Sequence, residues 1–135
     1  MKKIIITYKQ ILDAANGINT LMNTELPYLT GLKLQKTAKT LNEHMKDYQE
    51  EEAKLVDKYF EKDENGNLVS TENGGYKLLP DTIEEYIESR KTLDDFEMEV
   101  TVYPIDFDEI SNARIKPVDI PNLEFLIDLP DDLLE

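Results

Sequence analysis

Hydrophobic and polar positions along the chain follow several different periods, and the first of them predicts a β-strand that leads into a helix. Residues 2–7 are rich in β-branched apolar side chains, which favours a strand with one buried face. Thr7 and Gln10 then form a capping-box pattern, in which two side chains bind the free amides at a helix start. Apolar residues next recur every three or four positions, as on one helix face: Tyr8, Ile11, Leu12, Ala15, Ile18 and Met22. Gly17 is expected to weaken this helix by about 1 kcal/mol relative to alanine.

A second, longer helix is predicted from about residue 30 to about residue 60. Its apolar positions recur at alternating steps of three and four, the spacing of helices that pack along a seam. Two Asn-Gly pairs follow, beginning at Asn65 and Asn73, and the segment between them is short and partly β-branched. Asn-Gly is typical of tight hairpin turns, so we expect a β-hairpin over residues 65–79.

A third helix is predicted to begin after Pro80 and to end near residue 95, with Asp81 as its N-cap. Its apolar residues share one face: Ile83, Tyr86, Ile87 and Leu93. Acidic residues share the opposite face: Asp81, Glu84, Glu85, Glu88 and Asp95. An acidic helix face is either a solvated surface or a docking surface, and the residues alone leave both alternatives open.

The second and third helices are therefore expected to form a long antiparallel hairpin over residues 30–95, with the β-hairpin at its tip. A fold-back near residue 71 pairs residues whose numbers sum to about 142. The predicted contacts are Leu55 with Ile87, Val56 with Tyr86, and Tyr59 with Ile83.

One predicted contact within this hairpin is ionic. Glu52 interrupts the apolar face of the second helix, and Arg90 interrupts the apolar face of the third. The same count places these two residues opposite each other. We therefore predict a Glu52–Arg90 ion pair whose main effect is to fix the helix register, because desolvation offsets much of the attraction.

The period changes to two after Phe96, which predicts a strand over residues 97–103. Apolar and polar residues alternate there: Met98, Val100 and Val102 with Glu97, Glu99 and Thr101. Because one face of this strand is apolar, we expect it to pair with residues 3–7 in a small sheet.

The predicted fold class is therefore α+β and mostly helical, in a single domain over residues 1–135 that ends in an acidic segment over residues 104–135. Within that segment, residues 121–130 mix large apolar residues with acids. They are expected to form either a packed helical turn or an exposed peptide that docks on a partner.

Charge narrows the choice of partners. The chain has 135 residues, with 15 Lys or Arg and 29 Asp or Glu, so its formal net charge is −14. Residues 1–60 contain nine basic and eight acidic residues, whereas residues 61–135 contain six basic and twenty-one acidic residues. Nucleic acids are bound chiefly by Lys and Arg that neutralise phosphates, so direct nucleic-acid binding is disfavoured. The lysine cluster of Lys33, Lys36 and Lys39 is interpreted as a solvated helix face.

Membrane insertion and secretion are also disfavoured. No apolar run approaches the ~20 residues needed to span a membrane, so no membrane contact is expected. Lys2 and Lys3 precede a strand-like run and not the apolar core of a signal peptide. Cysteine is absent, which excludes disulfides and a cysteine nucleophile. An intracellular protein is expected.

The chain lacks the residue patterns that catalysis and cofactor binding usually require. His44 is the only histidine, so no second imidazole stands at metalloprotease spacing. The acidic turn Asp63–Asn67 has glycine at its fourth position, whereas an EF-hand calcium loop needs glycine at the sixth. No glycine-rich phosphate loop is present. We therefore predict a protein that is not an enzyme and that uses no metal and no cofactor.

Three stretches of the chain carry a resemblance to a known group of proteins. They are the opening residues 1–19, the segment Lys58–Asn67, and the acidic ending in which a strand precedes a Leu-rich segment. Together they resemble small acidic proteins encoded by temperate phages and prophages of Gram-positive bacteria. The resemblance is one of pattern, and it implies no catalytic residues. It implies a viral protein that acts by protein–protein contact, in the cytoplasm of the infected bacterium or in the virion.

Two hypotheses about function follow from this resemblance. In the first, the protein inhibits a bacterial host protein such as a defence nuclease, by presenting carboxylates where phosphates would lie. The predicted partner-binding residues are Glu84, Glu85, Glu88, Asp94 and Asp95, together with Asp63 and Glu64 in the acidic turn. In the second, it is a component of virion or tail assembly that contacts phage structural proteins or copies of itself as a homo-oligomer. An adaptor of another kind is a third alternative.

Overall fold

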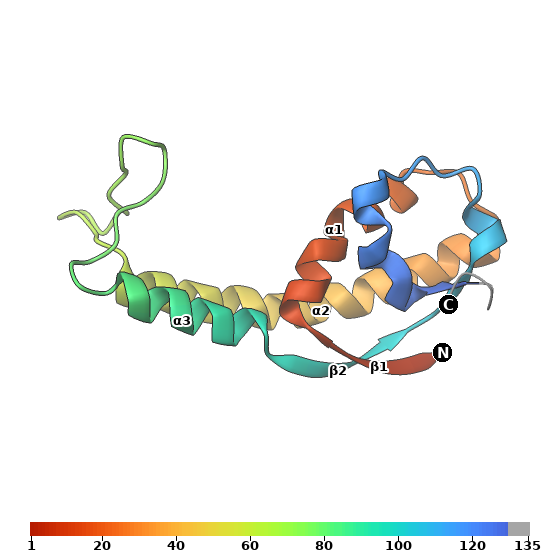
Figure 1. The fold of residues 1–135 in the computed structure, drawn as a ribbon, viewed down its shortest axis with the longest axis horizontal. Coiled ribbons are helices and arrows are strands. Elements are labelled where there is room, and N and C mark those ends of the chain that lie inside the picture. Colours follow the sequence, from red (N-terminus) through yellow and green to blue (C-terminus); the bar gives the residue numbers. More distant parts are fainter. Residues whose placement is uncertain (130–135) are drawn as a thin grey trace. The chain divides into compact units, whose positions relative to one another are not determined.

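The structure, a computed structural model, describes residues 1–129. The described chain is mostly helical with two small sheets, which confirms the mostly helical α+β class (Figure 1). It forms two compact units, one made of Met1–Met45 and the residues from Glu97 onward, the other of Lys46–Phe96. The predicted segments 104–135 and 121–130 extend past Leu129, and residues 130–135 lie outside the described residues.

In the first unit, strand β1 (Lys2–Thr7) pairs with strand β2 (Glu97–Val102) in an antiparallel sheet, as predicted. Ile4 lies opposite Val100 and Ile6 opposite Met98. Ile6 and Val100 are buried on one face, whereas Ile5 on the other face is 67% exposed. The alternation of apolar and polar residues thus separates a core face from a solvent face.

Helix α1 (Tyr8–Met22) begins with the predicted capping box. The Gln10 amide donates to Thr7 Oγ1 at 3.1 Å, and the Thr7 amide donates to Gln10 Oε1 at 2.9 Å. Tyr8 and Ile11 are buried as predicted, but the rest of the buried face differs: Ala14 and Leu21 are buried, while Leu12 and Met22 are exposed.

Small residues explain which face of α1 is buried. The 3₁₀ helix η3 (Pro121–Leu126) packs against α1, with Leu123 and Leu126 buried. A Cβ atom on Gly17 would lie 2.6 Å from Leu123 Cδ1, so only glycine permits this close approach. Gly17 therefore contributes to packing, which the helix-propensity argument did not include. Residues 121–126 therefore form the packed helical turn that was one of the two predicted alternatives, and not an exposed peptide.

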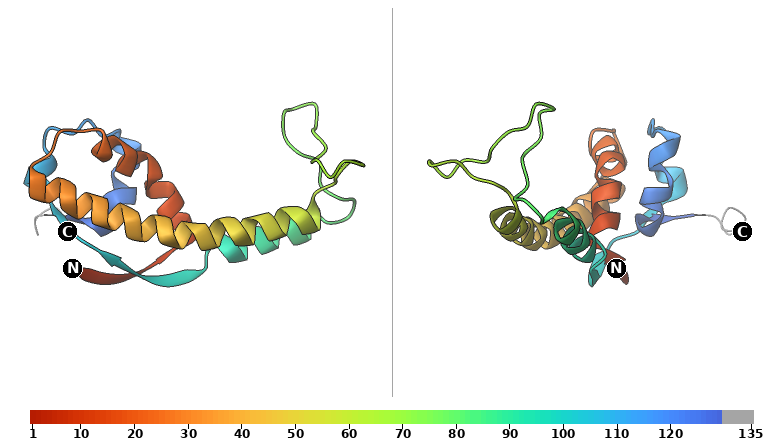
Figure 2. Two further views of the ribbon diagram at one scale, coloured as in Figure 1. Left: turned by 180° about the vertical axis from the view of Figure 1, so that it is seen from behind. Right: turned by 60° about the vertical axis from the view of Figure 1, so that its left-hand side comes forward.

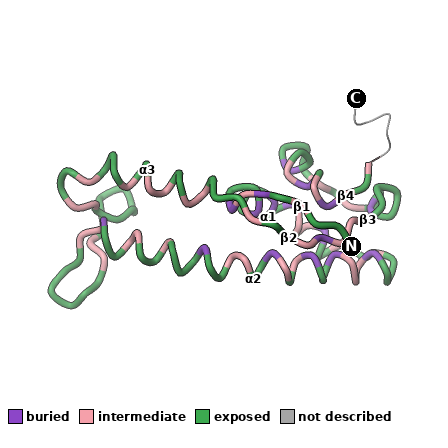
Figure 3. The backbone as a smooth tube through the Cα atoms, turned by 90° about the horizontal axis from the view of Figure 1, so that it is seen from below, coloured by how far each residue is buried: buried purple, intermediate pink, exposed green. Residues whose placement is uncertain are grey.

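Helix α2 (Tyr28–Tyr59) has the predicted extent and contributes to both units. In the first unit it supplies Leu34 and Leu41 to two apolar clusters, one with Leu21 and Leu123 and one with Val100. Figure 3 shows buried positions in purple along this part of α2. The Tyr103 amide donates to Thr37 Oγ1 at 2.8 Å, which ties the end of β2 to the helix.

Short elements complete the first unit. Strands β3 (Ile105–Asp106) and β4 (Ile127–Asp128) pair in parallel, which the sequence pattern did not predict. Two further 3₁₀ helices, η1 (Phe107–Ile110) and η2 (Pro117–Asp119), lie between them in the chain.

The second unit contains the C-terminal half of α2, the segment that follows it, and helix α3 (Ile83–Asp94). In both views of Figure 2, α3 lies alongside this half of α2. Their contacts run in opposite order along the two helices: Tyr48 with Asp94, Glu52 with Arg90, and Tyr59 with Glu85. The two helices are therefore antiparallel.

Two details of α3 differ from the prediction. Its N-cap is Thr82 and not Asp81, which has a left-handed backbone with φ of 63°. Thr82 Oγ1 donates back to the Leu79 carbonyl at 2.6 Å and so does not cap the helix. Ile83 and Ile87 were predicted to be buried, but they are 56% and 60% exposed. The face toward α2 instead contains partly buried residues: Tyr86, Ser89, Arg90 and Leu93.

In the segment between α2 and α3, the chain on the two sides of the second Asn-Gly turn pairs as predicted, through Ser70 and Tyr76. A third stretch, which contains Phe60 and Lys62, also pairs with these two, so the segment is more than a single hairpin. Three backbone hydrogen bonds form a closed ring: Glu61 donates to Lys77 at 2.8 Å, Lys77 to Val69 at 2.8 Å, and Val69 to Glu61 at 3.1 Å. Glycines with positive φ, Gly66 at 81° and Gly74 at 83°, form the two turns between these segments. Glu-Asn-Gly occurs at the same place in both turns, eight residues apart.

Candidate partner-binding surfaces

Polar side chains at the centre of the second unit connect α2 to α3. The hydroxyl of Tyr48, which is 2% exposed, donates to Asp94 Oδ1 at 2.7 Å. Arg90 lies over the Tyr48 ring, with its guanidinium carbon 5.7 Å from the ring centroid. The predicted Glu52–Arg90 ion pair is present, with Arg90 Nη2 donating to Glu52 Oε2. The two charges that interrupt the apolar pattern of each helix are thus paired across the two helices.

This arrangement shifts two protonation equilibria. Burial and the hydrogen bond to Asp94 raise the pKa of Tyr48 to about 12. The pKa of Arg90 is also raised, because Tyr48 and Glu52 together outweigh the opposing effect of burial. The Arg90 and Glu52 side chains are still 31% and 36% exposed, so solvent screening limits the pair to about 1 kcal/mol or less. The pair therefore constrains the register of the two helices more than it stabilises the fold.

Tyr59 forms a second connection between the two helices. Its hydroxyl donates to Glu85 Oε1 at 2.9 Å and lies 3.3 Å from Ser89 Oγ. Its ring packs edge-on against Tyr86, with the centroids 5.8 Å apart. Tyr59 therefore contacts α3 at Glu85, Tyr86 and Ser89.

The seven predicted partner-binding residues all lie in the second unit, and three of them bind neighbouring groups within it. Glu85 accepts the Tyr59 hydroxyl, and Asp94 accepts the Tyr48 hydroxyl. Asp63 Oδ1 accepts two backbone amides of its own turn, at 2.9 and 3.0 Å. These three carboxylates have structural roles, so they are weaker candidates for binding a partner.

The other four predicted residues are exposed: Glu64, Glu84, Glu88 and Asp95. Within residues 1–129, no hydrogen bond or ion pair involves their carboxylates. Glu84 and Glu88 stand one turn apart on α3, and each directly follows an exposed isoleucine, Ile83 or Ile87. Sequence reasoning missed these isoleucines as surface residues, because helical spacing alone fits more than one buried face.

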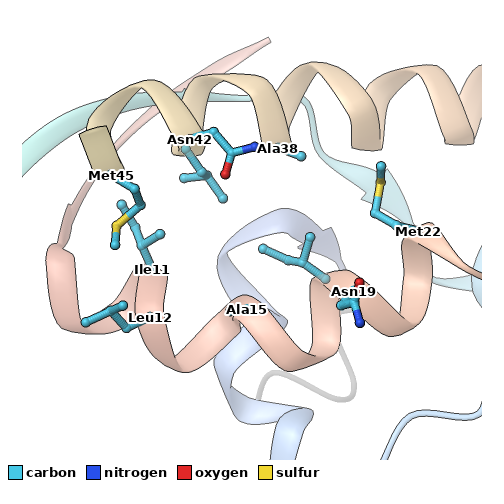
Figure 4. A pocket seen from close by; sticks show the side chains of 10 residues that line it. Ile11, Leu12, Ala15, Asn19, Met22, Ala38, Asn42 and Met45 are labelled. Atoms are coloured by element: carbon cyan, nitrogen blue, oxygen red, sulfur yellow. The ribbon is translucent and has the colours of Figure 1, made fainter. Parts of the chain in front are cut away.

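An apolar groove in the first unit is a further candidate site (Figure 4). It has a volume of about 270 Å³ and lies between α1 and α2. Leu12 and Met22 of α1, which were predicted to be buried, line it together with Met45 of α2. Its polar groups include the side-chain amides of Asn19 and Asn42, and no titratable side chain lines it. The groove therefore offers apolar contact and amide hydrogen bonds, but no acid or base.

Neither a metal-binding cluster nor a membrane-spanning helix occurs in the part of the chain that the structure describes. No group of three or more His, Asp or Glu residues lies close enough together there to hold a metal ion. No helix in residues 1–129 combines the length and the apolar character needed to cross a membrane. In the predicted lysine cluster, Lys36 Nζ lies 5.3 Å from the centroid of the Tyr103 ring. His44 is partly buried on α2.

The chain matches no protein-family model, no curated protein and no solved structure at a significant level.

Proposed function

We propose that this protein is a phage-encoded, non-enzymatic binding protein that inhibits a bacterial host protein. The observation that supports this proposal best is the pair Glu84 and Glu88, exposed one turn apart on α3 with no internal partner in the described chain. Lys46–Phe96, the unit that contains them, has seven basic and fifteen acidic residues, a net charge of −8. An exposed acidic helix on a strongly negative unit favours a positively charged partner.

Electrostatics suggests the class of host protein. Carboxylates spaced along a helix can occupy a basic groove that normally holds phosphates, and complementary potentials accelerate the encounter. A defence nuclease has such a groove and is the target class that we favour. The binding residues in this proposal are Glu84, Glu88, Asp95 and Glu64, because Glu85, Asp94 and Asp63 bind neighbours within the unit.

The test reverses charge where the structure leaves carboxylates free. E84K/E88K changes the net charge from −14 to −10, and D108K/E109K makes the same change at exposed residues of the first unit. The tagged protein is used to retrieve its partner from a Gram-positive host, and the purified partner is then titrated with each variant by calorimetry. E84K/E88K should weaken binding at least about tenfold, and the control by less than about twofold.

A functional readout accompanies the titration. The activity of the retrieved partner should fall when the wild-type protein is added and should recover with E84K/E88K. Unchanged affinity of E84K/E88K would exclude this surface, and unchanged partner activity would exclude inhibition.

Virion or tail assembly is the second candidate function. The observation that favours it is a pair of exposed large side chains at the start of α2, Tyr28 at 85% and Leu29 at 60% exposure. Light scattering coupled to size-exclusion chromatography separates the two candidates. A ring or a concentration-dependent polymer favours assembly, whereas a stable small species favours the inhibitor.

A further inference from the structure

We propose that Ile83 and Ile87 form the apolar anchor of the α3 surface, and that its occupant is a basic amphipathic helix of the partner protein. This inference rests on the proposed function and deepens it, because it specifies the chemistry of the partner. The surface would then bind by a combination of apolar burial and charge, and not by charge alone.

Helix geometry places the two kinds of residue in neighbouring rows. Ile83 and Ile87 are four residues apart, so they lie on the same side of α3 one turn from each other. Glu84 and Glu88 follow them by one position and form a parallel row about 100° further round the helix. An incoming helix can therefore contact both rows.

The isoleucines are available because other residues fill the space between α2 and α3. The Tyr86 ring packs edge-on against Phe60 and Tyr59, with centroids 5.1 and 5.8 Å away. Arg90, which lies further along α3, is held by Glu52 and Tyr48.

Charge selects the occupant. Two cations at the contact between α2 and α3 are engaged by other carboxylates, since Lys58 Nζ lies 3.9 Å from Glu85 Oε1 and Arg90 pairs with Glu52 and Asp94. A second copy of this chain would bring another unit of net charge −8 against the first, which disfavours self-association.

A basic amphipathic helix satisfies both rows. Its apolar side chains would pack between Ile83 and Ile87, as ridges of one helix pack into grooves of another. Its Lys or Arg side chains, whose apolar stems lie along the contact, would reach Glu84 and Glu88.

The experiment uses two synthetic peptides of about 18 residues and identical Leu and Lys composition. One peptide has its leucines on a single helix face, and the other has them dispersed so that no face is apolar. Each is titrated by fluorescence anisotropy into the full-length protein at physiological salt. The wild type should bind the amphipathic peptide at least about tenfold more tightly than the dispersed one.

Two double variants test the anchor. I83Q/I87Q keeps good helix-forming residues on α3 and should abolish most of the preference for the amphipathic peptide. The matched control I5Q/V118Q replaces isoleucine and valine side chains that are 67% and 74% exposed in the first unit, and it should keep the preference. If I83Q/I87Q still prefers the amphipathic peptide over the dispersed one as strongly as the wild type does, the proposal that Ile83 and Ile87 form the anchor is overturned.

Charge reversal separates failure of the anchor from failure of the proposed function. If E84K/E88K binds the dispersed peptide as tightly as the wild type does, Glu84 and Glu88 do not attract a basic partner, and the proposed function fails. If E84K/E88K weakens both peptides while I83Q/I87Q changes nothing, only the anchor is wrong. If I83Q/I87Q converts a dimer into a monomer in light scattering, the occupant is a second copy and the proposal is overturned.

Discussion

Two helical glycines have opposite surroundings, and they show how a single residue can determine packing. A Cβ atom at Gly17 would meet three side-chain atoms of the buried Leu123 within 2.8 Å. A Cβ atom at Gly31, in the first turn of α2, would meet nothing within 4 Å. The two positions therefore separate the intrinsic helix preference of alanine from the packing cost of its methyl group.

G17A should lower the free energy of unfolding by about 1–2 kcal/mol, because overpacking outweighs the better helix propensity of alanine. G31A should raise it by about 0.5–1 kcal/mol, because only the propensity term applies there. Urea denaturation measures both. A stabilising G17A would show that α1 and η3 are not in close contact.

Tyr48 provides a residue-scale prediction with a pH dependence. Y48F should lower the free energy of unfolding by about 1.5 kcal/mol at neutral pH, since it removes a hydrogen bond to a charged group. The pKa of Tyr48 is raised from 10.0 to about 12 by folding, so its contribution is complete below pH 10 and is lost as the pH rises toward 12.

Urea titrations of wild type and Y48F from pH 7 to pH 11 measure this difference. The gap between the two proteins should narrow above pH 10. Y28F, at a side chain that is 85% exposed, should match the wild type at every pH. A constant gap for Y48F would contradict the raised pKa.

At the scale of elements, α2 and α3 are joined mainly by polar and aromatic contacts. Tyr48 and Tyr59 are the two buried residues of the second unit. Because few residues are buried between α2 and α3, the specific contacts of Glu52, Arg90 and Glu85 determine how the two helices align.

A double-mutant cycle with E52Q and R90Q should give a coupling energy of about 0.5–1 kcal/mol between these positions. Part of the coupling should survive at high salt, because both side chains are only about one-third exposed. The exposed pair Lys54–Glu51 is the control and should show no measurable coupling. Zero coupling between positions 52 and 90 would argue against the observed register.

Charge dominates at the scale of the whole molecule. With 29 acidic and 15 basic residues, like-charge repulsion outweighs the exposed ion pairs, and salt screens that repulsion. The free energy of unfolding in urea should therefore rise by about 1 kcal/mol between low salt and 0.5 M NaCl. E84K/E88K, with a net charge of −10, should show a smaller rise. A fall in stability with salt would mean that the ion pairs dominate.

The sequence alone determined the features that depend on local signals or on a single long-range match. The capping box at Thr7 and the extent of α2 follow from side-chain patterns that act within a few residues, and the pairing of β1 with β2 follows from the match of two distant strands that each have an apolar face. The Glu52–Arg90 pair could also be predicted from the sequence, because two opposite charges, each at an apolar position of its helix pattern, both need a partner.

Only the tertiary structure decided which of several equivalent faces is buried and which carboxylates are free. Spacing of three and four residues fits more than one face of α3, and packing of Tyr86 against Phe60 left Ile83 and Ile87 exposed. The seven acids of the candidate surface look alike in the sequence. Hydrogen bonds from tyrosines on α2 make Glu85 and Asp94 structural, because the donors are brought to them by folding and not by neighbouring residues.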